Sequence, residues 1–445
     1  MANYTEVSDL PKGLMLCNYS INQGAVTVES INAFLDHSNY PIFPYSLTNG
    51  FSEDFPYEQF DFIIIHYSII PTLPGYLPDT IADRLRKFEG PIFQFIQDDY
   101  RRVSLMRDFI KRVGVDAVYS IMPLETAKKL YGGIKPNLKI HSYLAGYASS
   151  WLNMEKTVPL SRRKTAVGYR GREYPYWFGE ITTLKIDLAK RLKKQLKKKW
   201  IKTDFSVRER DRIYGRDWVK FLIRCRAIYG TESEVNYLDP HGAMANWYNT
   251  LEQLNKHPSS GKKWDGRKVV DTDFFKRNTQ PAPGSMSIIP PRVFEVICLR
   301  SANVLMEGNY SNVLEPWRHY IPLKKDLSNL DEVVKALKND ALISEMIATT
   351  FAEIATNEKY MWQGFGTFVD QTFEKQLKKI KLKPSTQLLT CSQLAKISGH
   401  FPYIPNPHTI TVANPKNIGI KYAIKRFLRK KWRSLLNLFR SIIHP

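Results

Sequence analysis

Short apolar runs alternate with helix-type patterns along the first third of the chain. The fully apolar run FIII suits a buried strand of a parallel sheet, because such a strand is covered on both faces, and PIFQFI is expected to be extended as well. Between them, apolar positions recur at three- and four-residue steps, which predicts helices over residues 28–35, 81–88 and 106–113. The expected strands are residues 13–17, 62–65, 91–96 and 117–121. This alternation predicts an α/β domain with a parallel sheet and helices on both faces.

The same pattern starts again after residue 155. Its expected elements are a strand over 164–169, helices over 180–199 and 293–299, a strand over 302–305, and helices over 331–337 and 343–355. Residues 256–291 are rich in Pro, Ser and Gly and are expected to form an inserted loop. We therefore predict two α/β domains, over residues 1–155 and 156–380.

The C-terminal part of the chain has a different character. Residues 381–415 are expected to be a linker. Residues 416–445 contain nine Lys and Arg, no Asp or Glu, and apolar residues at helical steps. This pattern predicts a basic amphipathic helix on an anionic membrane surface. The residues expected to meet the membrane are Lys425, Arg426, Phe427, Arg429 and Trp432.

Charge is distributed unevenly over the 445 residues, whose net charge is +22. Residues 1–155 hold 13 Lys and Arg against 17 Asp and Glu, whereas the remainder holds 52 against 26. The basic second part favours an anionic partner: nucleic acid, a membrane or a phosphorylated small molecule. The four scattered cysteines exclude a disulfide framework and suit a reducing cytosol. Neither a secretory signal nor an apolar run of spanning length is apparent.

The strongest local motif lies in residues 290–337, where Arg292 and Glu295 open a predicted helix before a buried strand. A carboxylate near the carboxyl ends of parallel strands can accept two hydrogen bonds from a ribose diol. The alternative is that Glu295 interacts with its own helix start and pairs with Arg292. The spacing leaves both interpretations open.

Four segments together resemble group 1 glycosyltransferases with the GT-B fold. They are Arg292-Val293-Phe294-Glu295 with its surroundings, HYIPLKKDLSNL at 319–330, VGYRGREYPYWFGEITTLK at 167–185 and RIYGRDWVKFLIRCRAIYGTES at 212–233. The resemblance is to bacterial surface-polysaccharide enzymes and spore-maturation-type transferases, and it covers most of residues 60–370. It implies two Rossmann-like domains facing a cleft, with a nucleotide-sugar donor held mainly by the second domain.

The resemblance also implies roles for individual residues. Glu295 matches the glutamate that binds the donor ribose, with Arg292 beside it. Arg170, Arg172 and Lys185 match basic residues that meet the pyrophosphate, and three cations can neutralise a diphosphate leaving group without a metal. The alternative for Arg170 and Arg172 is ordinary surface charge. No cofactor or metal is expected, and the nucleotide-sugar is a substrate.

The chain departs from the family at one position. Many members carry a second glutamate eight residues before the ribose-binding one, where this chain has Ser287. Glu232 is the candidate replacement, and in the family that glutamate contacts the donor sugar near the reacting carbon. The alternative is that Glu232 is a loop residue. Retention of configuration is the expectation from the resemblance.

Polar residues follow strands in the first domain too. His66 follows FIII, and Asp98 and Asp99 follow PIFQFI, so all three are candidates to line the cleft and to meet the acceptor or shuttle its proton. Gly24 follows the first strand and would let backbone approach the donor. Each has a structural alternative: a buried histidine, a satisfied carboxylate, a turn glycine.

Two competing signals carry less weight. Asp271 and Asp273 form a D-x-D triplet that could hold a divalent ion, but they lie in the expected inserted loop. The lysine run at 190–202 suits the solvated face of an amphipathic helix. No G-x-G-x-x-G or Walker-type motif occurs, which disfavours dehydrogenases and P-loop enzymes.

The sequence therefore predicts a cytoplasmic glycosyltransferase bound peripherally to the inner face of a bacterial membrane. It would move a sugar from a nucleoside-diphosphate sugar to a hydroxyl of a cell-surface glycan precursor, such as a lipid-linked acceptor. Nucleic acid is not an expected partner. The alternative is a catalytically degenerate, membrane-associated scaffold or polyanion-binding protein. The base, sugar, acceptor, linkage and oligomeric state are not indicated.

Overall fold

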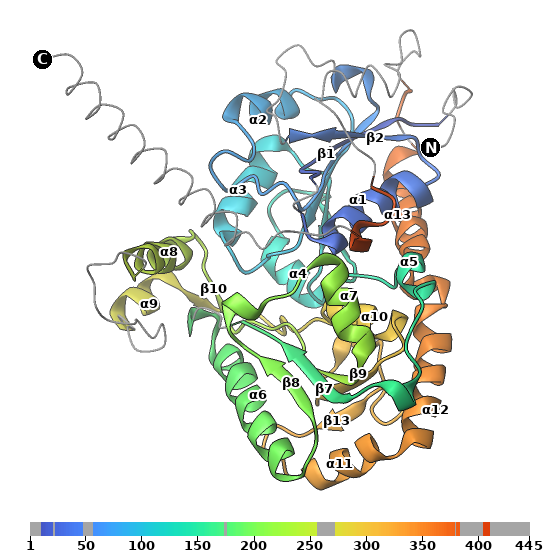
Figure 1. The fold of residues 1–445 in the computed structure, drawn as a ribbon. Coiled ribbons are helices and arrows are strands. Elements are labelled where there is room, and N and C mark those ends of the chain that lie inside the picture. The colour runs from blue at the N-terminus through green and yellow to red at the C-terminus, as the bar shows by residue number, and fades with distance from the viewer. Residues whose placement is uncertain are drawn as a thin grey trace, which may run out of the picture.

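The computed structural model describes residues 10–20, 23–47, 57–172, 176–255, 272–378, 380–382 and 404–409. These residues form two α/β domains, one above the other in Figure 1. The predicted fold class of two Rossmann-like domains is confirmed. The predicted tail helix, with Lys425, Arg426, Phe427, Arg429 and Trp432, lies outside the described residues.

The first domain is built on a six-stranded parallel sheet of order β2-β1-β3-β4-β5-β6. Its strands are β1 Gly13–Cys17, β2 Ile42–Ser46, β3 Phe62–Ile65, β4 Ile92–Ile96, β5 Ala117–Ser120 and β6 Lys139–Ser142. The helices are α1 Ala25–His37, α2 Asp79–Arg86, α3 Val103–Val113 and α4 Leu124–Tyr131. All four predicted strands and all three predicted helices of this domain form. The two strands not predicted, β2 and β6, lie at the edges of the sheet, and β2 contains Pro44, which an edge strand tolerates.

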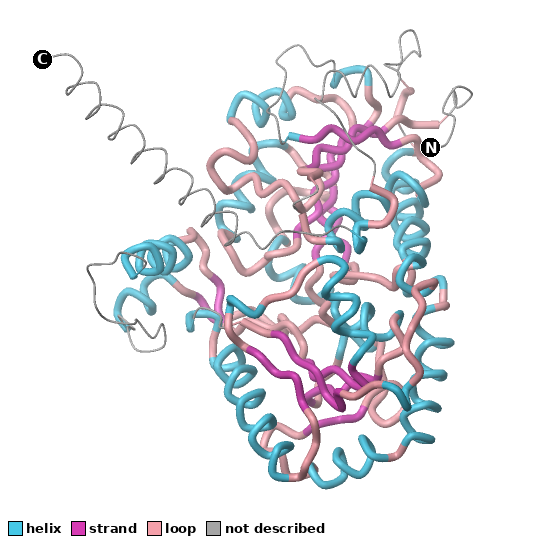
Figure 2. The backbone as a smooth tube through the Cα atoms, viewed as in Figure 1, coloured by secondary structure: helices cyan, strands magenta, loops and turns pink. Residues whose placement is uncertain are grey.

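The second domain has a five-stranded parallel sheet of order β13-β12-β9-β7-β8. Its strands are β7 Thr165–Arg170, β8 Thr203–Ser206, β9 Cys225–Gly230, β12 Ala302–Met306 and β13 Ile321–Leu323. The helices are α6 Glu180–Lys198, α7 Gly215–Arg224, α10 Pro291–Cys298, α11 Leu330–Lys338 and α12 Asp340–Thr350. Figure 2 shows the helices of this domain around the strands. The central strand β9 escaped prediction, because polar Arg226 interrupts its apolar pattern.

The chain segment between β9 and α10 extends from the second domain to the first domain. It contains the antiparallel pair β10 Tyr237–Leu238 and β11 Gln280–Pro281, with helices α8 Ala243–Asn255 and α9 Thr272–Asn278. The expected loop over 256–291 is thus wrong in part, since a short helix and strand form within it. Val235, Leu238, Met244, Met286 and Ile288 pack in the core of the first domain.

Helix α13, Trp362–Leu377, returns from the second domain to the first. Phe365, Val369 and Phe373 are buried in the first domain's core, and the Phe373 ring stacks on Phe93 with centroids 4.2 Å apart. Residues 362–377 were assigned by the sequence to the second domain, but they contact the first. Apolar side chains at every third or fourth position of α13 produce this packing.

Among the helices of the described residues, none is both long and apolar enough to cross a membrane.

Candidate active site

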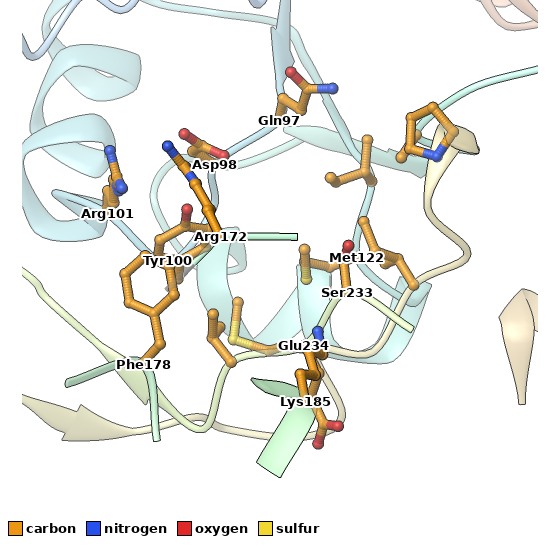
Figure 3. A pocket seen from close by; sticks show the side chains of 16 residues that line it. Gln97, Asp98, Tyr100, Arg101, Met122, Arg172, Phe178, Lys185, Ser233 and Glu234 are labelled. Carbon is orange, nitrogen blue, oxygen red and sulfur yellow. The ribbon is translucent and has the colours of Figure 1, made fainter. Parts of the chain in front are cut away.

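A cavity of about 290 Å³ lies between the two domains (Figure 3). The first domain contributes residues that follow β4 and β5, and the second contributes residues that follow β7 and β9, together with α6 and the start of α10. Both parallel sheets thus direct the carboxyl ends of their strands at this space. Ligands of open α/β sheets bind at that edge.

Three cationic side chains line the cavity: Arg101 from the first domain, and Arg172 and Lys185 from the second. Lys185 is only 9% exposed. Burial lowers its pKa to about 8, an effect that Glu234 and Glu232 partly oppose and Arg292 reinforces. Burying a charged ammonium costs free energy, because the group loses its hydration. A bound anion would compensate for that loss, so this position favours an anionic ligand.

Acidic groups face the same space. Asp98, from the loop after β4, and Glu234, from the loop after β9, both line the cavity. Arg101 lies over the rings of Tyr100 and Phe178, with centroids 5.4 and 5.6 Å from its guanidinium carbon. The cavity therefore combines cationic side chains, which can bind a phosphate group, with carboxylates and aromatic rings, which can contact the other parts of a ligand.

Asp99 turns inward, although it neighbours Asp98 in the sequence. It is 1% exposed, and its Oδ1 accepts hydrogen bonds from Ser120 Oγ at 2.9 Å and Tyr131 Oη at 2.8 Å. Burial raises its pKa to about 7, against the lowering effect of those two bonds. The structure therefore brings Asp98 to the cavity and leaves Asp99 beneath it.

Arg170 is not brought to the cavity. Its guanidinium bonds to Asp204 Oδ1 at 2.7 Å and to the Asp204 carbonyl at 2.8 Å, and it lies over the Phe221 ring. As the last residue of β7, it directs its side chain toward the neighbouring strand β8. The expectation that Arg170 meets the pyrophosphate is not met, and it takes a structural role instead.

Arg292 and Glu295 lie on α10, whose first residue, Pro291, borders the cavity. Neither of the two lines it. Arg292 donates from Nη1 to the Arg170 carbonyl at 2.9 Å, and Glu295 Oε2 accepts a hydrogen bond from Trp218 Nε1 at 2.7 Å. The predicted pairing of Glu295 with ribose stays a prediction, and its carboxylate already has a partner on α7.

Glu232 lies in the wall beside the cavity. Its Oε1 accepts a hydrogen bond from the backbone N–H of Tyr310 at 2.7 Å, and burial raises the pKa of its carboxyl. The next two residues, Ser233 and Glu234, line the cavity. Contact of Glu232 with a donor sugar stays a prediction, whereas its support of the loop after β12 is directly visible.

His66 lies in the interior of the first domain, not in the cleft. It is fully buried, and its two ring nitrogens lie 2.9 Å from Ser30 Oγ and Ser68 Oγ. Burial lowers its pKa to about 3, so the ring is neutral at physiological pH. The structure therefore does not bring His66 to the cavity, and its contact with an acceptor stays a prediction.

Gly24 precedes α1 with φ −61° and ψ 143°, a conformation open to any residue. The structure gives no special need for glycine there, and Gly24 is not among the residues that line the cavity. Asp271 lies outside the described residues, and Asp273 is exposed at the start of α9. Across the described residues, no group of three or more His, Cys, Asp or Glu is placed to hold a metal.

Several lining residues escaped the sequence analysis, above all Arg101, Phe178 and Glu234. Arg101 follows the segment 97–100, which the sequence placed at a strand end, so extending that segment by one residue would have included it. Phe178 and Glu234 come from separate loops, and only the packing of the two domains brings them to one cavity.

No protein-family model matches the chain. Among curated proteins, it is similar to uncharacterized protein 027R of Frog virus 3, with 25% identity over 142 residues, which is 26% of this chain and 14% of that protein. The chain thus matches only a small part of that relative's length.

Solved structures with a similar arrangement include glycosyltransferases. An alpha-glucosyltransferase in complex with UDP-glucose and DNA is 9% identical and has a TM-score of 0.48, over 83% of this chain and 100% of that one. A glycosyltransferase from Rickettsia africae is 9% identical, with a TM-score of 0.42 over 84% and 100% of the two chains. The Anabaena protein HepE in complex with UDP-glucose is 11% identical, with a TM-score of 0.42 over 83% and 100%. At these values, the similarities assign no activity to this chain.

Proposed function

We propose that this chain is a glycosyltransferase that uses a nucleoside-diphosphate sugar as its donor. The observation that carries the proposal is the convergence of Arg101, Arg172 and Lys185 on one cavity at the carboxyl edges of two parallel sheets. The sequence resemblance to group 1 glycosyltransferases supports the same reaction. A diphosphate carries the charge that such a set of cations stabilises.

In the proposed reaction, the bond between the anomeric carbon and the diphosphate oxygen breaks, and a new bond forms from that carbon to an acceptor hydroxyl. The nucleoside diphosphate leaves with the electron pair, and Arg172 and Lys185 stabilise its charge. Asp98, which lines the same cavity, accepts the proton of the acceptor hydroxyl. Retention of configuration, independence of metal, and a cell-surface glycan precursor as acceptor belong to this proposal.

The basic tail at 416–445 supports a further part of the proposal, in which the enzyme associates peripherally with the inner face of a membrane. Nine cations and a recurring apolar pattern favour anionic lipid. The alternative function is a non-catalytic scaffold that binds polyanions. Ser287, in the place of the family's first glutamate, is the observation that favours it.

A thermal-shift panel tests the donor site. Purified full-length protein is heated with UDP, GDP, ADP, CMP or dTDP, with and without a chelator. We expect one nucleotide to raise the Tm by about 2–4 °C at roughly 100 times its Kd, regardless of chelator. The shift should disappear in Arg172→Ala and Lys185→Ala but persist in Lys194→Ala, an exposed position on the same helix. If no nucleotide shifts the Tm, the scaffold function is favoured. A shift abolished by chelator would favour a metal-dependent enzyme.

A further inference from the structure

A second and larger cavity, of about 1030 Å³, borders the first one. It is enclosed by three parts of the fold: the chain after β5 and β6, the loop after β12, and the segment that leads into α13. The first domain, the second domain and the returning helix all contribute. Its volume lies at the upper end of the range for ligand sites in proteins.

One extended segment separates the two cavities. Met286 and Ile288 line the first cavity, whereas Ser285 and Ser287 line the second. Alternate residues of an extended chain point to opposite sides, so this segment presents an apolar face to one space and hydroxyls to the other.

Hydrogen bonds from both domains hold this segment in place. The Ser285 carbonyl accepts a hydrogen bond from Thr126 Oγ1 of α4 at 2.7 Å. Ile288 pairs with Ser233 through two backbone hydrogen bonds of 2.9 and 3.0 Å, and the Ile289 N–H donates to Ser311 Oγ at 3.1 Å. The wall is therefore a fixed part of the domain junction.

The larger cavity has a mostly neutral polar lining. Among the described residues that line it, two are charged, Glu358 and Lys359, and both are exposed. The remaining polar groups are hydroxyls and amides, including those of Ser142, Asn309, Asn312, Thr367 and Gln371. Aromatic rings lie among them: Tyr143, Tyr147, Tyr360 and Phe368.

This composition suits an uncharged carbohydrate. Hydroxyls and amides both donate and accept hydrogen bonds, as sugar hydroxyls do, and aromatic rings offer apolar faces to sugar C–H groups. A phosphate would find one exposed lysine opposed by a glutamate there, and so would lose hydration without adequate charge compensation. The smaller cavity, with three cations, has the opposite preference.

The loop after β12 has an unusual backbone. Tyr310, Ser311 and Asn312 are three consecutive left-handed residues, with φ of 48°, 56° and 57°. Left-handed non-glycine residues cost free energy and persist where the surroundings fix them, often at ligand sites. Here Glu232 accepts the Tyr310 N–H, and Asn309 Nδ2 donates to Asn312 Oδ1 at 2.7 Å. These contacts hold Asn309, Ser311 and Asn312 at the cavity.

We propose that the larger cavity binds a neutral oligosaccharide segment of the acceptor, beside the charged donor cavity. That this glycan is the acceptor rests on the proposed function. The binding of a neutral glycan in this cavity does not depend on it. In this arrangement, the wall formed by residues 285–288 separates the charged and uncharged substrates, and Ile121, which lines both cavities, lies where they meet.

Direct binding measurements test this inference. Maltotriose, cellotriose and chitotriose are titrated into full-length protein and followed by saturation-transfer NMR. We expect at least one trisaccharide to bind the wild type. Ser287→Trp and Thr367→Trp, which fill the cavity from opposite walls, should each weaken that binding at least tenfold. Lys375→Trp, at an exposed position of the same helix α13 outside the cavity, is the matched control and should bind as the wild type does.

Nucleotide affinity is measured on the same variants. Unchanged nucleotide binding by Ser287→Trp and Thr367→Trp shows that they are folded and that the two cavities are separate. Failure of all three trisaccharides to bind the wild type would overturn the inference, as would binding that survives both cavity substitutions. If a trisaccharide binds as expected but no nucleotide does, the proposed donor function fails while neutral-glycan binding stands.

Discussion

The two cavities at the domain junction differ in chemistry, although they share a wall. The smaller one gathers Arg101, Arg172 and Lys185 with Asp98 and Glu234, whereas the larger one is lined mainly by hydroxyls, amides and aromatic rings. The difference follows from which segments end at each place. Helix α6 and the loops after β4, β7 and β9 supply the charges. The chain after β5 and β6, the loop after β12 and helix α13 supply most of the neutral groups.

This contrast shows how one interdomain junction can handle two unlike ligands. The cations that could bind a diphosphate gather in the smaller cavity, whereas the larger one has one exposed Lys359 beside Glu358. Substitutions at four residues around the junction sharpen this contrast, from the largest expected effect to the smallest.

Asp98 is the carboxylate of the charged cavity that we expect to act on the acceptor. Asp98→Asn removes a base but keeps the shape of the side chain. We expect release of nucleoside diphosphate from the donor sugar to slow by about 10²–10⁴-fold, with nucleotide affinity unchanged. A coupled assay of nucleotide release measures this effect. A variant with full activity would remove Asp98 from the mechanism.

Asp99 tests the buried neighbour. Because its folded-state pKa is raised to about 7, folding favours its protonated form. This stabilisation is present at low pH and is lost as the pH rises toward 7. Asp99→Asn imitates the protonated form, so its stability relative to the wild type should increase between pH 5 and pH 8. At about 1.4 kcal/mol per pKa unit, the increase amounts to a few kcal/mol.

Urea denaturation of the wild type and Asp99→Asn at the two pH values measures this difference. The same measurement on Asp98→Asn, a substitution at the exposed neighbour, is the matched control. An equal response of both variants to pH would contradict the burial argument.

Lys185 sets the pH dependence of the donor site. Burial lowers its pKa to about 8, so the free protein loses this cation as the pH rises through that value. The apparent Kd for the bound nucleotide should therefore rise by up to roughly tenfold per pH unit above 8. Lys185→Arg keeps its charge over this range and should flatten the profile. Isothermal titration from pH 7 to 9.5 measures it, and parallel profiles would exclude Lys185 as the titrating group.

Glu232 supports the loop after β12, through the hydrogen bond that its carboxylate accepts from the Tyr310 N–H. Glu232→Gln retains an oxygen for the Tyr310 N–H, whereas Glu232→Ala leaves that donor unpaired. If Glu232 supports the loop, only the alanine variant should weaken trisaccharide binding. The expected loss is roughly tenfold, because the missing hydrogen bond contributes about 1 kcal/mol or slightly more. If Glu232 instead contacts the donor sugar, as the sequence predicted, the glutamine variant should already slow transfer. NMR titration and the nucleotide-release assay separate these outcomes.

The sheet strands were the most predictable part of this molecule. Runs such as FIII are apolar at every position because β3 is covered on both faces, and that requirement is visible in the residues themselves. Strand β9 was missed because Arg226, its second residue, extends to Asp340 and the Leu337 carbonyl. One polar side chain that reaches out of the sheet interrupts the pattern without interrupting the strand.

For the site residues, the sequence predicted which strand each one follows but not where its side chain points. Asp98 was a candidate because it follows a parallel strand, whose carboxyl end lies at the ligand edge. Arg172 and Lys185 were candidates through the resemblance to group 1 glycosyltransferases, and Arg172 also follows a strand. Sequence position could not determine side-chain direction. Arg170 and Arg172 are two residues apart, yet one binds Asp204 and the other lines the cavity. Asp98 and Asp99 are adjacent and face solvent and core, respectively.

By itself, the sequence determined the two α/β domains, because strands that are buried on both sheet faces require apolar residues at successive positions. It also determined the excess of basic residues in the second part of the chain. Only the tertiary structure decided which cations meet one ligand, that α13 returns to the first domain, and that residues 285–288 divide two cavities. These features depend on contacts between segments more than 100 residues apart, such as that of Thr126 with Ser285. The residues of one segment do not indicate which distant segment it will contact.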